Sequence, residues 1–311
     1  MDHGAVCGAM FELWVPITAA AALFQTWRTA LQQKLRGVLS VNAAGFIRYL
    51  YALPTGLLLL SGYTLLSGQS LPTANPWFLL FCALGGLLQI FGTSLLIMAF
   101  GFRSFAVGTA YAKTEALQGA IAAWILLGEA ISPLAGVGIA LGVVGVLVLS
   151  LAGRGITRHE ILAATFQPAA LCGLGAGLIF AFTTIFIKKA NIALGGPDVI
   201  HQALFTLVIT NFMQTAMQGS WLAWREPDQF RKAFATWRSS AWVGTLSACG
   251  SACWFSAFAM APVALVRAIG QIEMIFTLLF SRFYLKERMK PGDVAGLVLV
   301  IAGVVFVLLG R

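Results

Sequence analysis

Long apolar stretches cover most of this 311-residue chain and restrict its fold more than any other feature. Hydrophobic residues make up 59% of the sequence and charged residues only 10%, a balance outside the usual range of soluble domains. A helix crosses a bilayer core with about 20 apolar residues. The apolar runs long enough for this are 11–33, 43–67, 76–100, 104–128, 133–151, 167–189, 198–222, 240–260, 262–284 and 292–310. We therefore predict an all-α integral membrane protein with ten transmembrane helices.

The sequence also repeats itself at a constant offset of 158 positions, which relates Glu115 to Glu273. Other residues that match at this offset are Phe24 and Phe182, Gly92 and Gly250, Ala106 and Ala264, Glu129 and Glu287, Pro133 and Pro291, Gly138 and Gly296, and Gly145 and Gly303. A fixed offset over most of the chain indicates an internal duplication.

Each copy contains five of the predicted helices. Five is an odd number, so the second copy enters the membrane from the opposite side, and the repeat is predicted to be inverted. The predicted domains are a first five-helix repeat at 11–151, a short polar linker at 152–166 and a second five-helix repeat at 167–310. Inverted repeats are the common plan of secondary transporters, in which the binding site lies between the copies.

Two of the predicted helices carry ionisable side chains near their middle: Lys113 and Glu115 in one, Arg267 and Glu273 in the other. Such a side chain costs roughly 2.5–3.5 kcal/mol on insertion scales, so each needs a reason. In the functional interpretation, Lys113 and Arg267 bind a carboxylate or phosphate. Glu115 or Glu273 then accepts an ammonium group or carries a proton, because desolvation favours the neutral form of a carboxyl group. In the structural alternative, the four residues form ion pairs that join the two helices without a ligand.

Four uncharged residues are weaker candidates for substrate binding. Gln271 is the equivalent of Lys113 at the repeat offset and shares a helix face with Arg267. Tyr111, Trp27 and Trp254 could line a cavity and stack on a planar substrate, although aromatic residues at helix ends are often interfacial anchors. Glu129 and Glu287 precede Pro133 and Pro291 and are predicted to be structural caps or turns.

The formal net charge of +9 is spread over short loops, which favours a role in membrane topology over nucleic-acid binding. Loops after odd-numbered helices hold thirteen Lys and Arg residues, whereas those after even-numbered helices hold only Lys188 and Lys189, and Arg311 closes the chain. The positive-inside rule then places both termini outside. The long loop 223–241 alternates aromatic and basic residues, which predicts an interfacial amphipathic helix that contacts membrane lipids.

Catalytic and cofactor motifs are missing from the sequence. It contains no Gly-x-Ser-x-Gly, no His-Glu-x-x-His and no Gly-x-x-x-x-Gly-Lys. We therefore expect neither an enzyme nor an ATP-driven pump, and we expect no cofactor or bound metal. The sequence gives no indication of the oligomeric state.

Two motifs carry a family resemblance over essentially the whole chain. Residues 127–133 (Leu-Gly-Glu-Ala-Ile-Ser-Pro) and 285–291 (Leu-Lys-Glu-Arg-Met-Lys-Pro) each precede a Gly-rich helix, and Phe46-Ile47-Arg48-Tyr49 opens the second helix. The chain resembles the EamA family of the drug/metabolite transporter superfamily. This resemblance implies a ten-helix carrier with a central cavity and alternating access, which exports amino acids or other small metabolites.

The chain departs from the family at one place that concerns the site. Family members often have a proline in the middle of the fourth and ninth helices, where this chain has Lys113-Thr114-Glu115 and Gln271-Ile272-Glu273. The resemblance also implies cytoplasmic termini, against the charge count, so the orientation stays open.

We predict a secondary carrier, coupled to protons or to exchange, for a small charged or zwitterionic metabolite such as an amino acid. We expect it in the bacterial inner membrane with both termini on the same side. One alternative is a flippase for lipids or lipid-linked headgroups, and another is a membrane scaffold or sensor that transports nothing.

Overall fold

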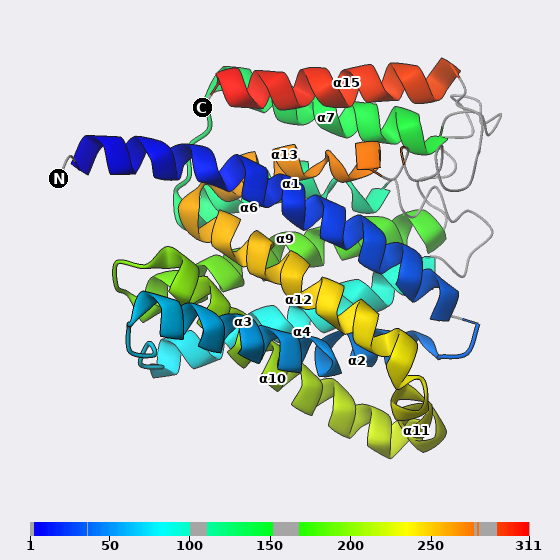
Figure 1. Ribbon diagram of the computed structural model, residues 1–311. Helices are drawn as coiled ribbons and strands as arrows, with labels where there is room; N and C mark the ends of the chain where they lie inside the picture. Colours follow the sequence, from blue (N-terminus) through cyan, green and yellow to red (C-terminus); the bar gives the residue numbers. More distant parts are fainter. Residues whose placement is uncertain are drawn as a thin grey trace. The chain divides into compact units, whose positions relative to one another are not determined.

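The computed structural model describes residues 3–35, 37–99, 111–151, 168–276, 279 and 291–310, and these residues fold into helices joined by turns and short loops (Figure 1). The helices are α1 (His3–Leu35), α2 (Val41–Leu50), α3 (Ala52–Ser67), α4 (Pro76–Ala99), α6 (Glu115–Leu127), α7 (Pro133–Leu151), α9 (Pro168–Leu194), α10 (Val199–Arg225), α11 (Pro227–Ala235), α12 (Trp237–Met260), α13 (Val263–Gly270) and α15 (Pro291–Leu309). The prediction of an all-helical protein is confirmed for this part of the chain.

Four helical segments within the described ranges are long and apolar enough to cross a membrane: Val41–Ser67, Pro76–Ala99, Ala170–Leu194 and Trp237–Met260. Shorter apolar helices occupy Glu115–Leu127, Pro133–Val148 and Val294–Leu309. These lengths and compositions agree with an integral membrane protein. The ten-helix inverted topology stays a prediction, as does the linker at 152–166, which lies outside the described residues.

The chain forms two compact units, and each combines segments from both predicted repeats. Unit 1 comprises Met1–Ile90 and Thr183–Ala261, and unit 2 comprises Phe91–Phe182 and Pro262–Arg311. The unit boundaries fall inside α4 and α9.

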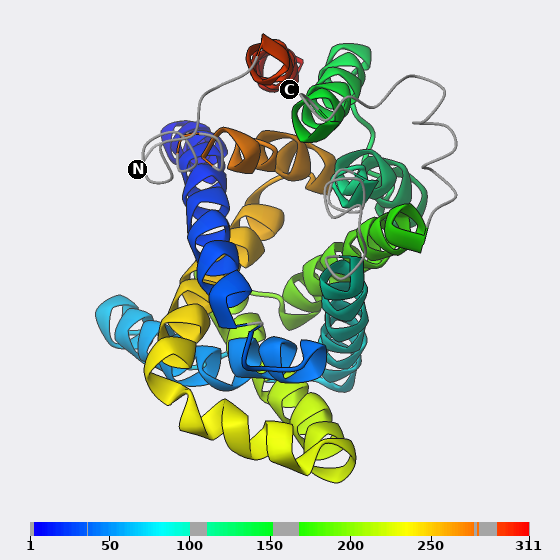
Figure 2. The same ribbon diagram turned by 90° about the vertical axis from the view of Figure 1, so that its right-hand side faces the viewer.

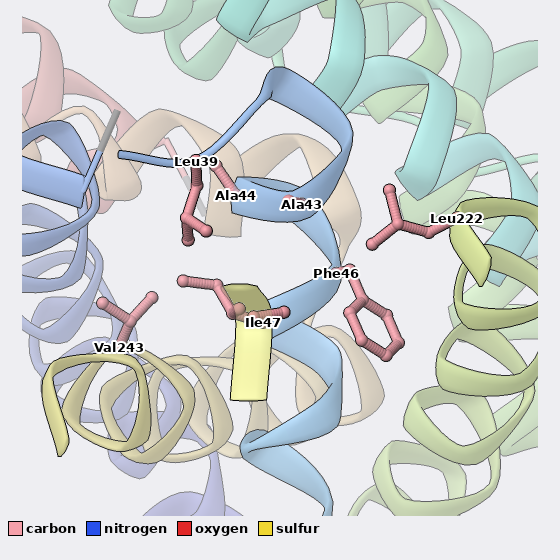
Figure 3. Close-up of a cluster of buried hydrophobic side chains, with 8 residues drawn as sticks. Leu39, Ala43, Ala44, Phe46, Ile47, Leu222 and Val243 are labelled. Atoms are coloured by element: carbon pink, nitrogen blue, oxygen red, sulfur yellow. The ribbon is translucent and has the colours of Figure 1, made fainter. Parts of the chain in front are cut away.

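Unit 1 is built around α2 and around the long contact of α1 with α12. Ser40 caps α2, because its Oγ accepts the N–H of Ala43. Buried apolar side chains of α2, α10 and α12 then pack together; Figure 3 shows Ile47 pointing toward Val243 and Phe46 lying beside Leu222.

Helix α11 confirms the helix that was predicted in the loop 223–241, and part of its apolar face packs on the protein. Phe230 stacks on Phe46 with ring centroids 5.6 Å apart, and Ala233 is fully buried in the same cluster. Phe234 and Trp237, the other aromatic residues of the predicted apolar face, are 45% and 56% exposed, and the contact of this face with membrane lipids stays a prediction. The basic residues of α11, Arg231 and Lys232, are exposed.

Unit 2 contains a close antiparallel crossing of α7 and α15, which lie side by side in both views (Figures 1 and 2). A Cβ added to Gly138 would lie 2.7 Å from the carbonyl oxygen of Gly303, and one added to Gly145 would lie 2.9 Å from that of Gly296. Glycine allows the backbones to approach this closely in lipid. The offset of 158 relates Gly138 to Gly296 and Gly145 to Gly303, so it converts the first contact into the second. Two copies related by a local two-fold axis would require this.

Candidate functional site

The first half of the candidate site is a break in the helix just before Glu115. Tyr111 and Ala112 are helical, Lys113 and Thr114 form a turn, and α6 begins at Glu115. The N–H of Thr114 donates to the carbonyl of Tyr111 (3.1 Å), and that of Leu117 donates to the carbonyl of Thr114 (3.0 Å). These bonds span three residues instead of four, so the helix tightens locally.

The same break recurs 158 positions later, where α13 ends at Gly270, Gln271 and Ile272 form a turn, and residues 273–276 are helical again. The N–H of Ile272 donates to the carbonyl of Ile269 (3.0 Å), and that of Ile275 donates to the carbonyl of Ile272 (2.9 Å). Our expectation of continuous helices over 104–128 and 262–284 is therefore wrong at 113–114 and 271–272. Helix breaks of this kind are common at the binding sites of transporters.

Four charged side chains form two ion pairs at these breaks. Lys113 Nζ lies 2.6 Å from Glu273 Oε2, and Arg267 Nη2 lies 2.7 Å from Glu115 Oε1. The side chains of Lys113, Glu273, Arg267 and Glu115 are 22%, 12%, 16% and 17% exposed, respectively. All four side chains are therefore largely buried, and each keeps a small exposed fraction.

Each ion pair joins a base of one predicted repeat to an acid of the other. Glu115 also begins α6, where the partial positive charge of a helix N-terminus favours a carboxylate. Two positive and two negative groups leave the site formally neutral. The pairs that the structural alternative requires are thus present, and the same four side chains remain the candidates for substrate binding and proton coupling.

Gln271 is the uncharged candidate with the clearest geometry. It is 5% exposed, and within the described part of the chain neither its amide nitrogen nor its amide oxygen has a hydrogen-bond partner. A Cβ added to Gly142 of α7 would collide with the Gln271 amide oxygen, so the amide rests directly on that glycine. A buried amide without a partner is costly, so Gln271 remains a candidate for hydrogen bonding to a substrate.

Side chains around the first break include two that the sequence did not single out. Thr114 Oγ1 donates to the carbonyl of Tyr111 (2.6 Å), and Gln118 Nε2 donates to Thr114 Oγ1 (3.0 Å). A Cβ added to Gly177 of α9 would lie 3.1 Å from the carbonyl oxygen of Ala112, so α9 lies close against the break. The sequence pattern that could have identified Thr114 and Gln118 is their spacing, because they are polar residues four positions apart beside Glu115.

The two tryptophan candidates belong to unit 1. Trp27 on α1 is 54% exposed, whereas Trp254 on α12 is buried. Trp254 Nε1 donates to Gln25 Oε1 (3.1 Å), and its ring stacks on Phe258 with centroids 5.6 Å apart. Their proposed role in substrate binding stays a prediction.

Glu129 has the structural role that the sequence predicted. Its Oε2 accepts the N–H of Val263 (2.8 Å) at the start of α13, where Pro262 supplies no N–H and no cap. Its equivalent Glu287 lies outside the described residues.

The fold and the site together define an integral membrane protein made of helices, with paired charges at helix breaks. Residues 167–309 match the EamA-like transporter family. This stretch is therefore an EamA domain of the drug/metabolite transporter superfamily, and the resemblance found in the sequence is confirmed there. No curated protein matches the chain.

A crystal structure of another protein has the same fold. It is 16% identical to this chain and superposes with a TM-score of 0.70, covering 94% of this chain and 98% of the other. At this identity the likeness concerns the fold alone.

Proposed function

We propose that the protein is a secondary active transporter that exports a small zwitterionic or charged metabolite, an amino acid in the first instance, with coupling to protons or to exchange. The observation that supports this proposal most is the pair of ion pairs at the helix breaks 113–114 and 271–272. Helices that only pack against each other need no charged side chains in an apolar environment, where such side chains are costly. They also need no break in either helix.

The geometry favours a substrate that carries both charges. Lys113 and Glu273 already neutralise each other, as do Arg267 and Glu115. A substrate carboxylate that binds to Lys113 competes with Glu273 for the ammonium group, and a displaced Glu273 lacks a partner. The ammonium group of the same substrate can pair with the displaced Glu273. A zwitterion therefore exchanges partners without leaving a charge uncompensated, whereas a simple anion leaves one carboxylate unpaired.

Proton coupling follows from the same exchange. A displaced carboxylate in a low-dielectric site is stabilised either by a cation or by protonation. Glu115 and Glu273 are the groups that we propose for this role. If a proton takes the place of the substrate's ammonium group, proton and substrate bind alternately to one acid.

A thermal-shift screen of the purified protein against a panel of amino acids and anionic metabolites tests the proposal. We expect stabilisation by at least one zwitterionic amino acid, and loss of this stabilisation in both Lys113→Ala and Arg267→Ala. Lys189→Ala removes a cation of unit 1 and serves as the control, which should keep the shift.

Two results would contradict the proposal. Equal ligand shifts in the wild type, Lys113→Ala and Arg267→Ala would exclude the cationic site. Stabilisation by lipids alone would instead favour a flippase.

A further inference from the structure

The end of α10, the whole of α11 and the start of α12 present aromatic and basic side chains together to the outside of unit 1. Trp224 is 73% exposed and Trp242 is 64% exposed. Trp221 and Trp237 are also exposed. These three elements follow one another along the chain and meet around α11 at the lower right of Figure 1. We call the exposed Trp, Arg and Lys side chains of residues 221–242 the 221–242 surface.

Two arginines of this surface lie over indole rings. Arg225 Cζ is 4.6 Å from the centroid of Trp224, and Arg238 Cζ is 5.7 Å from the centroid of Trp237. A cation above an exposed ring keeps its hydrogen-bond donors available to another group. Each pair therefore combines an apolar surface with charged donors, as residues at a membrane interface do.

The surface carries a net positive charge. Residues 221–242 contain four cations, Arg225, Arg231, Lys232 and Arg238, and two acids, Glu226 and Asp228, which leaves +2. One of these acids is turned into the protein, because the Glu226 carboxylate accepts bonds from Ser40 Oγ (2.5 Å) and Asn42 Nδ2 (2.7 Å). The four cations are all exposed.

Helix α11 packs against the rest of unit 1 through its start and through part of its aromatic face. Phe230 stacks on Phe46, and the rings of Phe230 and Phe234 meet edge to face at 5.1 Å. Glu226 ties the start of the helix to the cap of α2. Arg231 and Lys232 are therefore presented at a fixed place between the exposed tryptophans of α10 and α12.

We propose that the 221–242 surface binds the headgroup of an anionic phospholipid, with phosphate against Arg225, Arg231, Lys232 and Arg238 and the glycerol–acyl region against the tryptophans. Charge complementarity selects an anionic over a zwitterionic lipid, and exposed indoles favour the interfacial depth at which phosphates lie. This binding is independent of the transport proposed above.

Native mass spectrometry of the delipidated protein, titrated with phosphatidylglycerol or phosphatidylcholine, tests this inference. We expect tighter binding of phosphatidylglycerol. Arg231→Gln/Lys232→Gln should weaken its first binding step by about 30-fold, which corresponds to about 1 kcal/mol for each cation. Lys189→Gln removes a cation outside the surface and should leave that binding unchanged. Size-exclusion profiles and thermal midpoints confirm that the variants are folded, and Arg238→Gln alone should give an intermediate loss.

Three results would overturn the inference. They are equal affinity for the two lipids, unchanged phosphatidylglycerol binding in Arg231→Gln/Lys232→Gln, and equally tight binding of free glycerol 3-phosphate. The last result would assign the surface to a soluble phosphate instead of a membrane lipid.

Discussion

The ion pair between Lys113 and Glu273 predicts a specific pattern of rescue between substitutions. At an N···O distance of 2.6 Å, the gross attraction is about 6 kcal/mol for an effective dielectric constant near 20. Desolvation offsets much of this, so the useful quantity is the cost of removing one partner. Lys113→Met leaves the Glu273 carboxylate without its cation in a site that is mostly buried.

The cost of that change follows from the charge that it leaves behind. Removing one partner of a buried ion pair typically costs about 3–5 kcal/mol, because the remaining charge stays uncompensated. Both side chains keep some exposure, so we take the lower end of that range. We therefore expect Lys113→Met to lower the thermal midpoint by about 5 °C.

Removing the second partner as well should restore most of the stability. In Lys113→Met/Glu273→Gln no charge is left without a partner, and replacing a buried ion pair by neutral groups is often harmless. Tryptophan fluorescence during heating in detergent measures the midpoints of the wild type, both single variants and the double variant. Their double-mutant cycle should give a coupling energy above about 1 kcal/mol.

A non-partner combination provides the matched control. Lys113→Met/Glu115→Gln removes a base and an acid that are not paired with each other, and it disrupts both ion pairs. It should be less stable than Lys113→Met/Glu273→Gln. Equal rescue by the two combinations, or additive losses in Lys113→Met/Glu273→Gln, would refute the assigned pairing.

Two further substitutions test the packing around the site. Gly303→Ala should lower the thermal midpoint by the equivalent of roughly 1–3 kcal/mol, because its Cβ would lie 2.6 Å from the backbone nitrogen of Gly142. Gly136→Ala is the control, because its Cβ meets only a side chain at 4.0 Å. Equal thermal midpoints for the two variants would contradict the close crossing of α7 and α15. Glu129→Ala should cost about 1 kcal/mol through loss of the bond to the Val263 N–H, while Glu129→Gln, which keeps an acceptor oxygen, should lose less; identical losses would exclude the cap.

Much of the fold follows from hydrophobicity and repetition in the sequence. The apolar runs predicted helices in the described ranges, and α7 and α15 begin and end at equivalent positions of the 158-residue offset. Their glycines also indicated close packing, because lipid-exposed helices need small residues to approach each other. The 158-residue repeat therefore predicts local features such as helix ends and glycine contacts well.

The helix breaks could not be predicted in the same way. Neither 113–114 nor 271–272 contains proline or glycine, and although Gly270 precedes the second break, its equivalent before the first break is Ala112. The breaks lie beside the two ion pairs, whose partners are distant in sequence. For the same reason the sequence identified the four charged residues but could not tell that Lys113 pairs with Glu273 instead of with nearby Glu115.

Helix α11 shows a further limit of sequence patterns. Aromatic and basic residues in alternation predict an amphipathic helix, but an apolar face that packs on protein has the same composition as one that enters lipid. The contact between Phe230 and Phe46 joins residues that are far apart in the chain, so the sequence pattern could not predict that this part of the face packs on protein.

Uptake into proteoliposomes tests most directly whether the paired charges form the site of a transporter. The probe is a radiolabelled mixture of amino acids, added to vesicles that contain equal amounts of the wild type, Lys113→Ala, Arg267→Ala or Lys189→Ala. We expect saturable uptake above that of empty vesicles for the wild type and Lys189→Ala, and at least a tenfold loss in the other two variants, the change that about 1.4 kcal/mol of lost binding produces. Wild-type rates in both Lys113→Ala and Arg267→Ala would contradict the proposed site.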